Sequence, residues 1–154
     1  MTIGFIKTRG TVVSIGTTSS THLTDTYAEL EGAKVIGGNA GKTYQEIDIT
    51  VLTDSYKQTT KGIADGGSFQ LGGILKEDPA TATMAPGLQK LSDAADDETD
   101  PDVYNVKFLK PNGRTVYYKC RVLSFTVTYN QNQNVNEWQS KLMITQAPIH
   151  VAAA

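Results

Sequence analysis

Alternation of apolar and polar residues runs through much of this chain and predicts β-strands that bury one face. The clearest case is residues 45–52, where three branched apolar residues alternate with three polar ones: Ile47, Ile49 and Val51 with Glu46, Asp48 and Thr50. Successive side chains of a strand point to opposite faces, so the polar residues share one wet face. Residues 45–52 are therefore predicted to form a half-buried strand.

Three other strands are indicated in the first half of the chain. Residues 11–16 predict a first strand, and residues 27–36 predict a second, weaker one. A further strand covers residues 68–71, and the two glycines that follow it permit a bulge or a bend.

The second half of the chain predicts a hairpin and a long returning strand. Residues 110–113, Lys-Pro-Asn-Gly, form the turn, since proline presets φ and Asn-Gly tolerates positive φ. In the returning strand the apolar residues keep one parity up to Val122 and the other from Leu123 onward. A period of two cannot change parity without an extra residue, so a bulge or bend near Val122 is expected to turn the strand from one sheet to the next.

One helix is predicted, over residues 85–95. Pro86 suits the first helical turn, where its missing N–H costs little, and Leu88, Leu91 and Ala95 follow at helical spacing. The pattern as a whole predicts a mainly β fold with one α-helix, in which two packed antiparallel sheets form a sandwich or a partly closed barrel.

Three polar segments separate these elements. Residues 53–67 lack a sustained period and predict a polar loop or arm, residues 96–102 predict an acidic linker, and residues 130–136 predict an exposed polar loop. A chain of 154 residues with 39% hydrophobic content fits one domain with a modest core, so residues 1–154 are expected to fold as a single unit.

Residues 104–145 carry the most specific pattern. They begin Tyr-Asn-Val-Lys-Phe-Leu-Lys-Pro-Asn-Gly-Arg-Thr-Val-Tyr-Tyr, continue as a long strand and a polar Asn/Gln loop, and end in a strand from Trp138. This order resembles the C-terminal half of the major tail tube protein of long-tailed, siphovirus-type bacteriophages. Residues 46–55 and 63–71 extend the likeness, which covers roughly residues 45–146.

The resemblance implies a structural virion protein, related also to the tube protein of type VI secretion. Rings of six subunits would stack into a hollow tail tube, their inner strands joined into a continuous barrel, and DNA would pass through without specific binding. The implied partners are other copies of the chain and other tail proteins, namely the tape measure, tail terminator and tail tip. The implied location is the virion tail, assembled in the host cytoplasm.

Composition agrees with a chain that does not bind DNA tightly. A net charge of −2 provides no broad basic surface to neutralise phosphates. The single cysteine, Cys120, excludes an internal disulfide and lies on the apolar parity of its strand, so it is expected in the core. Trp138 alternates with Leu142 and Ile144 and is expected in the core or at an interface. His150 is expected on the surface. The N-terminal residues lack an apolar signal core and no run is long enough to span a membrane, so no membrane partner is expected.

Three local motifs resemble chemical sites but fail their requirements. Residues 37–43, Gly-Gly-Asn-Ala-Gly-Lys-Thr, are one residue too short between the glycines for a phosphate loop and precede a strand pattern, which favours a hairpin turn. Residues 96–107 place proline and lysine where a calcium loop needs glycine and glutamate. Ser20, His22 and Asp25 cluster locally, whereas a hydrolytic triad is normally assembled from distant positions. No catalytic residue, metal ligand or cofactor is predicted, and the chain is not expected to be an enzyme.

Two groups of residues are candidates for contacts. The polar run in the predicted arm is expected to touch a neighbouring subunit, with a weak nucleic-acid contact as the alternative; it comprises Asp54, Ser55, Tyr56, Lys57, Gln58, Thr59, Thr60 and Lys61. Glu46 and Asp48 are candidates for an acidic lumen lining that DNA slides past, or for ordinary outer-surface charges. A different class of function, a β-sandwich decoration or host-adhesion module, would show a concave aromatic site and would not polymerise.

Overall fold

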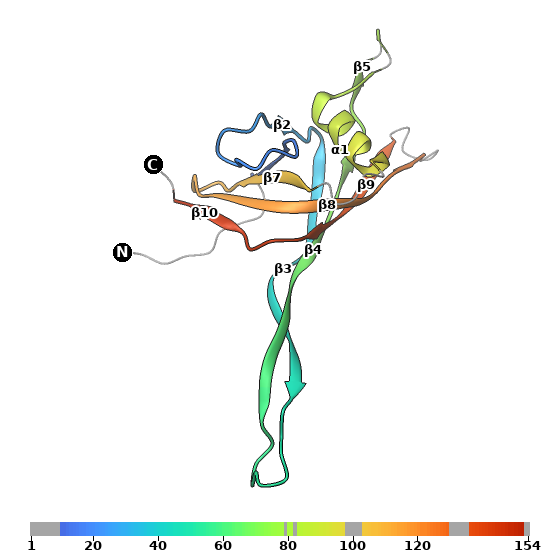
Figure 1. Cartoon of the computed structure of the whole chain (residues 1–154). Coiled ribbons are helices and arrows are strands. Elements are labelled where there is room, and N and C mark those ends of the chain that lie inside the picture. The colour runs from blue at the N-terminus through green and yellow to red at the C-terminus, as the bar shows by residue number, and fades with distance from the viewer. Residues whose placement is uncertain (1–9, 79, 82, 98–102, 130–135, 153–154) are drawn as a thin grey trace.

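The computed structural model describes residues 10–78, 80–81, 83–97, 103–129 and 136–152. It consists of a β-rich head and a long two-stranded arm that projects from it (Figure 1). The arm is residues 43–65, from the Thr43–Asp65 pair to the loop at its far end, and the head is the rest of the described chain. The elements are β1 (Val12–Ile15), β2 (Ala28–Glu29), β3 (Ala33–Asp48), β4 (Thr59–Ile74), β5 (Glu77–Asp78), β6 (Thr83–Met84), α1 (Pro86–Asp96), β7 (Tyr104–Leu109), β8 (Thr115–Thr128), β9 (Glu137–Ile144) and β10 (Ile149–Val151).

Eight strands form one antiparallel sheet in the order β2-β1-β7-β8-β9-β4-β3, with β10 beside β8, while β5 and β6 pair separately. The ring of Phe69 in β4 lies 4.8 Å, centroid to centroid, from the rings of Phe108 in β7 and Tyr118 in β8. Two strands separate β4 from β7 in the sheet, so the sheet must curl until its halves face each other. The predicted mainly β fold with one helix is confirmed. The two packed sheets expected from the sequence are instead two halves of one continuous antiparallel sheet, which does not close into a barrel.

Strand β8 joins the two halves by means of a bulge. Its pairing with β9 shifts register between Val122 and Ser124, where the apolar parity of the sequence changes. Leu123, between them, is 51% exposed. β8 pairs with β7 as far as Cys120, and beyond that residue its only described strand partner is β9. The predicted bulge is confirmed, and it bends one strand from the first half of the sheet into the second.

The core lies between the curled sheet and α1. The helix starts at Pro86, one residue after the predicted start, and buries Leu88, Leu91 and Ala94 against the sheet. Cys120 and Trp138 are both fully buried, as expected, and burial raises the pKa of the Cys120 thiol to about 12. The other buried hydrophobic residues are Val13, Ile15, Leu30, Phe69, Leu71, Val106, Phe108, Val116, Leu142 and Ile144.

The predicted β7–β8 turn is confirmed by its backbone. The Gly113 N–H donates to the Lys110 carbonyl oxygen at 2.9 Å, and Gly113 has a φ of 87°, which glycine adopts without strain. Strand β1 and the strand at residues 68–71 are also where the sequence predicts them, and β3 carries a bulge opposite Gly72 and Gly73. The predicted strand at residues 27–36 is divided into β2 and the start of β3.

The hairpin turn predicted at residues 37–43 is wrong, because these residues lie inside β3. The register of β3 against β4 shifts between Ala40 and Thr43, where β3 has one residue more than β4 and forms a bulge. Positive φ at Gly38 and Gly41 serves this irregular strand, so the glycines do not reverse the chain.

One prediction for the arm is also wrong, and a second is confirmed only in part. The strand at residues 45–52 ends at Asp48 and is not half-buried, since both of its faces are exposed. The polar loop or arm predicted at residues 53–67 does lie in the projecting arm as far as Asp65, but it is strand from Thr59 onward, and the actual loop is residues 49–58. Glycines at 62, 66 and 67 removed the side-chain period that identifies a strand, whereas backbone hydrogen bonds to β3 do not depend on that period. Most of the predicted acidic linker (98–102) and polar loop (130–135) lies outside the described residues.

Candidate assembly surfaces

The arm exposes apolar side chains that nothing in the described chain covers. All residues from 41 to 61 are exposed. The larger apolar side chains of the arm include a fully exposed leucine at its end; their exposed fractions are Tyr44 41%, Ile47 43%, Ile49 53%, Val51 58%, Leu52 106%, Tyr56 82% and Ile63 84%. An isolated two-stranded ribbon is at best marginally stable in water. The arm therefore has the composition of a surface that is covered in an assembly.

The two faces of the arm differ in chemistry. Lys61 lies directly opposite Glu46 in the register of β4 against β3. The Nζ of Lys61 lies 4.7 Å from the centroid of the Tyr44 ring, so these three side chains share one face. Ile47 Cδ1 lies 3.0 Å from the position that a Cβ on Gly62 would take, which places Ile47 on the opposite face. One face thus combines charge and an aromatic ring, and the other carries Ile47 together with the uncharged polar residues Gln45 and Thr60.

The loop at residues 49–58 is organised by short polar side chains. The Val51 N–H donates to a carboxylate oxygen of Asp54 at 3.0 Å, and the Asp54 N–H donates to the Val51 carbonyl at the same distance. The Gln58 N–H donates to the Thr50 hydroxyl oxygen at 2.8 Å, which closes the loop. Of the candidate contact residues, 54–58 lie in this loop and 59–61 begin β4. The structure thus brings these candidates together at the far end of the arm.

Glu46 and Asp48 lie within the arm on β3, and Asp48 is the last residue of that strand. Both are exposed, and hydrogen bonds from Thr50 lower the pKa of Asp48. The cation of Lys61 directly opposite Glu46 offsets part of the negative charge on this face.

The described sheet has two long unpaired edges. β3 is the last strand of the sheet order, so its outer edge has no strand partner in the described chain. Beyond Cys120, β8 pairs on one side only, with β9. The half β8-β9-β4-β3 therefore ends in an open edge on each side. Open edges present unpaired N–H and C=O groups that can pair with another chain.

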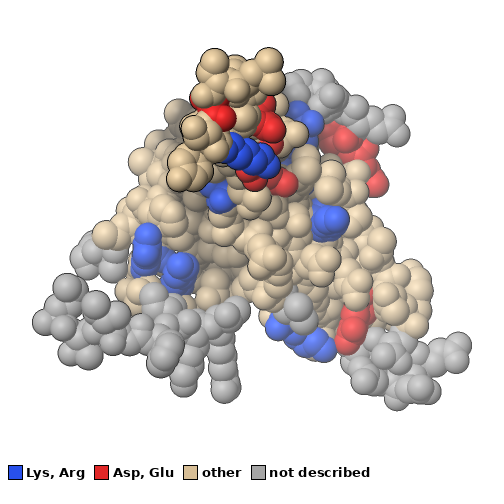
Figure 2. Space-filling view, turned by 90° about the horizontal axis from the view of Figure 1, so that it is seen from below, with Lys and Arg blue, Asp and Glu red and all other residues tan. Residues whose placement is uncertain are grey.

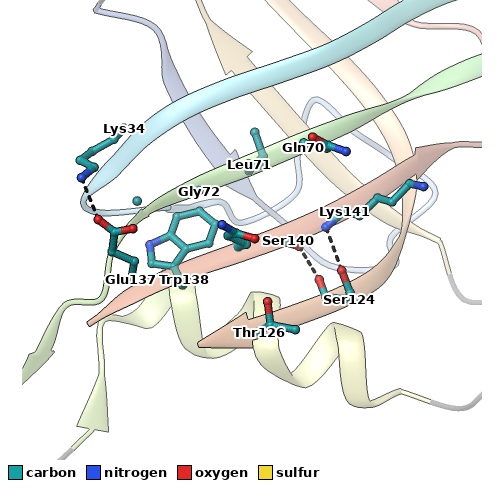
Figure 3. Close-up of a pocket in the computed structure, with 12 residues that line it drawn as sticks. Lys34, Gln70, Leu71, Gly72, Ser124, Thr126, Glu137, Trp138, Ser140 and Lys141 are labelled. Carbon is teal, nitrogen blue, oxygen red and sulfur yellow. Dashed lines mark hydrogen bonds and ion pairs between the residues drawn. The ribbon is translucent and has the colours of Figure 1, made fainter. Parts of the chain in front are cut away.

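A polar groove of about 360 Å³ crosses the face of this half-sheet (Figure 3). Its side chains include amides and hydroxyls, namely those of Gln70, Gln139, Ser124 and Thr126. At one end Lys34 Nζ and Glu137 Oε1 form an ion pair at 3.1 Å, the only such pair among the described residues. Lys141 is the remaining cation of the lining. Gln139 and Lys141 alternate with the buried Trp138, Ser140 and Leu142, so this is the wet face of the sheet.

A second groove, of about 540 Å³, lies where the arm meets the head. We call it the root groove. From the arm it is lined by Tyr44 and Ala64, and from the head mainly by Tyr118, Ile144, Ala147 and Pro148. Lys42 and Asp65 are the charged residues of its lining.

Asp25 and His22, two of the three residues that cluster like a hydrolytic triad in the sequence, make contacts that stabilise the fold. Asp25 accepts hydrogen bonds from the Thr17 N–H (2.7 Å) and hydroxyl (2.6 Å) and from the buried amide of Asn105 (2.8 Å). His22 packs its ring 5.0 Å from that of Tyr117. Burial raises the pKa of Asp25, but the bonds from Asn105, Thr17 and Thr26 outweigh it and lower the pKa overall. The carboxylate fastens the loop between β1 and β2.

The phosphate-loop-like segment gains no support from the described residues, and residues 98–102 of the calcium-loop-like segment lie outside them. Residues 37–43 continue into more strand, so they lack the helix N-terminus that a phosphate loop requires. Among the described residues no group of three or more His, Cys, Asp or Glu side chains could hold a metal ion. His150 is exposed on β10, as predicted. No helix in the described part of the chain is long and apolar enough to cross a membrane.

Charge on the arm side of the molecule is mixed. Seen from below, Lys and Arg side chains are scattered among Asp and Glu, with uncharged surface between them (Figure 2). This face carries no continuous basic area of the kind that binds phosphates tightly.

Comparison with solved structures shows the fold. The chain matches a protein in the tail of an empty GTA (gene transfer agent) particle with C6 symmetry, at 13% identity and a TM-score of 0.64, over 95% of this chain and 98% of that one. It matches a chain of the sheath-tube complex of an extracellular contractile injection system at 14% identity and TM-score 0.65, over 97% and 93%. A chain in the sixfold-symmetrised baseplate of the anti-feeding prophage matches at 10% identity and TM-score 0.58, over 99% and 98%.

No family model and no curated protein matches the chain. The resemblance to tail tube proteins is confirmed at the level of the fold. Sequence reasoning missed the root groove, because its residues come from separate strands and the segment after β9. It also wrongly predicted that Ile47 and Ile49 are buried. Alternation of apolar and polar residues favours a strand with one covered face, but it does not tell whether the same chain or another molecule covers that face.

Proposed function

We propose that this chain is the subunit of a phage-type tail tube, a structural virion protein whose rings of six copies stack into a hollow tube that delivers DNA. The observation that carries the proposal is the fold likeness, over 95–99% of the chain, to chains of tail, tube-complex and baseplate structures. Two of these structures have sixfold symmetry, which supports rings of six.

The open sheet edges support ring closure by strand pairing. Strands β8, β9, β4 and β3 alternate in direction, so the β3 edge of one copy and the β8 edge of the next would meet antiparallel. Pairing in this sense extends the sheet from copy to copy and leaves no edge once the ring closes. The continuous sheet would form the wall around the lumen.

The wet face of that half-sheet suits a channel for DNA. Its groove presents mainly amides and hydroxyls; the Lys34–Glu137 pair carries no net charge, and Lys141 is the one remaining cation of the lining. A lining of this kind makes few of the counterion-releasing contacts that hold DNA to a basic surface. Glu46 and Asp48 remain candidates for acidic lining where the arm borders the lumen.

The arm is the proposed contact between subunits. Its exposed apolar side chains and its loop at residues 49–58 need a cover that the described chain does not supply. This favours the subunit-contact reading of residues 54–61 over a nucleic-acid contact. The alternative of a decoration or adhesion module is not favoured, because the fold likeness is to chains of tail, tube-complex and baseplate structures.

The same proposal fixes the partners and the location. Other copies of the chain form the tube, and a tape measure, a tail terminator and a tail tip protein would meet it inside and at its ends. The protein would be assembled in the host cytoplasm and reside in the virion tail. No cofactor and no catalytic activity belong to this function.

Electron microscopy of the purified protein after concentration tests the proposal. Rings of six copies, or tubes built of such rings, are the expected result, and sedimentation over a wide concentration range would show the corresponding large species. A protein that stays monomeric under all conditions that promote tail assembly, and that is absent from tails, would contradict it.

A deletion tests the role of the arm separately. Removing residues 58–61 shortens one strand of the ribbon at its far end. The midpoint of thermal unfolding of the head should not change, because these residues lie in the arm and outside the core of the head. Polymerisation should be lost. Thr60→Ser, which keeps the length of the ribbon, is the control. Normal tubes from the deletion variant would show that the arm is not the contact.

A further inference from the structure

The polar groove on the half-sheet β8-β9-β4-β3 contains one charge that nothing in the described chain balances. Lys34 and Glu137 of its lining pair with each other at 3.1 Å, whereas Lys141 forms no ion pair among the described residues. Figure 3 shows the Lys141 side chain extended away from that pair. A lysine ammonium is a compact point charge on a flexible stem, so this cation is free to meet an anion from outside the chain.

The sheet around Lys141 places no acidic residue next to it. On the two neighbouring strands, the positions across from Lys141 or diagonal to it are Ser68, Gln70, Gly72, Arg121, Ser124 and Thr126. Five of these six are uncharged and the sixth is another cation. Side chains at such positions are the ones that reach each other across a sheet, so a carboxylate partner would have to lie here.

Two lysines on the other half of the sheet show the contrast. The Nζ of Lys107 lies 5.7 Å from the centroid of the Tyr27 ring, and the Nζ of Lys119 donates to the Ser20 carbonyl oxygen at 3.5 Å. Tyr27 and Ser20 belong to the loop between β1 and β2, so this loop occupies both cations. Lys141 has no such contact in the part of the chain that the structure describes.

The proposed ring would repeat this cation six times. Strand β9, which carries Lys141, lies between β8 and β4, so pairing at the two open edges of the half-sheet leaves its face uncovered. In a ring of six copies, rotational symmetry would place six lysines at one height around the lumen. Each ring of the tube would add one such band, in a groove whose other side chains are mainly amides and hydroxyls.

We propose that Lys141 is the residue through which the wall of the tube contacts the phosphates of passing DNA. The inference rests on the proposed tube function and adds the residue that makes DNA passage depend on salt. A lysine binds a phosphate by charge and reads no sequence, so the contact can form and break along any DNA. One lysine per copy releases few counterions, so DNA is held loosely and still moves.

Binding of a short fluorescent DNA duplex to assembled tubes measures this contact. The duplex is present during assembly, and the bound fraction is followed by co-sedimentation at several salt concentrations. Lys141→Gln should weaken binding at low salt by about tenfold or more and flatten its salt dependence, because every lysine of a band is lost at once. Lys141→Arg keeps the charge and should bind like the unmodified tube. Lys110→Gln removes the same charge in the β7–β8 turn and should leave binding unchanged.

Cross-linking identifies the contacting lysine in the unmodified protein, so it does not depend on whether a variant assembles. The duplex carries abasic sites, and the amine nitrogen of a nearby lysine attacks the aldehyde carbon of such a site. Water leaves to give an imine, which borohydride reduces to a stable amine by adding hydride to that carbon. Peptide mapping should find the DNA on Lys141. Cross-links confined to Lys42, Lys57 and Lys61 would overturn the assignment.

The outcomes separate this inference from the proposed function. Tubes that bind no DNA at low salt, or that bind it equally well with glutamine at position 141, would overturn the phosphate contact and leave the tube proposal intact. Equal losses from Lys141→Gln and Lys110→Gln would also overturn it, because the effect would then follow total charge and not position. Absence of tubes from the unmodified protein would overturn both proposals.

Discussion

The head and the arm share the two longest strands of the protein, yet only the head buries them. In the head, Phe69 and Leu71 of β4 are 5% and 3% exposed; in the arm, Ile63 of the same strand is 84% exposed and Ile47 of β3 is 43% exposed. Backbone hydrogen bonds continue through both parts. Strand pairing therefore determines the shape of the ribbon. The stability of each part depends on burial, which a single copy of the chain provides in the head but not in the arm.

The junction between the two parts is made of glycine and bulges. Register shifts occur between Ala40 and Thr43 and again between Tyr44 and Glu46, so the regular alternation of the head sheet ends there. Gly67, at φ 87°, sits where a Cβ would overlap the Asn39 carbonyl oxygen. The ribbon can leave the head at this point because glycine allows the close approach of the two strands.

Removal of the central core residue should have the largest effect on stability. Trp138→Ala deletes a fully buried ring that stacks on Phe125 at 6.0 Å between centroids, and should lower the free energy of unfolding by about 3–5 kcal/mol. Urea titration of the unassembled protein measures this. Tyr56→Ala in the arm, where the ring is 82% exposed, is the matched control and should change the value by less than about 0.5 kcal/mol. Equal losses would refute the contrast between head and arm.

A substitution at the junction should have an intermediate effect. Gly67→Ala forces a side chain into positive φ and against the Asn39 backbone, which should cost about 1–3 kcal/mol of unfolding free energy. Gly37→Ala is the control, since its Cβ would meet only the Gln70 carbonyl oxygen at 3.8 Å. Thermal unfolding of both variants gives the comparison, and a neutral Gly67→Ala would mean that the junction relaxes freely.

Acid should loosen a loop of the head. The pKa of Asp25 is lowered in the folded protein, despite the burial that raises it, by hydrogen bonds from Asn105, Thr17 and Thr26. Its contribution to stability is therefore complete above the unfolded pKa near 3.8 and is lost as the pH falls through the lower, folded pKa.

The substitution Asp25→Asn removes this dependence. It should reduce the unfolding free energy by about 1 kcal/mol at pH 7, and its stability should change less than that of the unmodified protein between pH 5 and pH 2. Denaturant titrations at several pH values measure both. Parallel pH profiles would show that Asp25 does not fasten the loop.

Charge reversal in the arm should have the smallest effect on stability. Replacing Glu46 and Asp48 together by lysine should leave the unfolding free energy within about 0.5 kcal/mol, because both side chains are exposed. DNA passage through the tube should become slower and more dependent on salt, since the added cations bind phosphates. A map of the tube in which both positions face its outer surface would reject the lumen assignment while leaving the tube itself in place.

Much of the head could be predicted because its signals are local. The Pro-Asn-Gly turn depends on the φ preferences of three adjacent residues, and the helix from Pro86 follows from its first residue and the spacing of Leu88 and Leu91. The bulge at Val122 was visible as a change of parity within a single strand. Such features need no information about the rest of the fold.

The sequence by itself determined where apolar and polar side chains alternate, where the chain turns and which residues are fit for a core. Only the tertiary structure decided that β3 and β4 continue as an arm beyond the core, and that Tyr44, Tyr118 and Pro148 meet in one groove. The physical reason is that alternation along a strand records a preference for burial on one face, whereas the partner that provides the burial depends on long-range pairing. In the head that partner is another part of the same chain; for Ile47, Ile49 and Leu52 the described chain contains none.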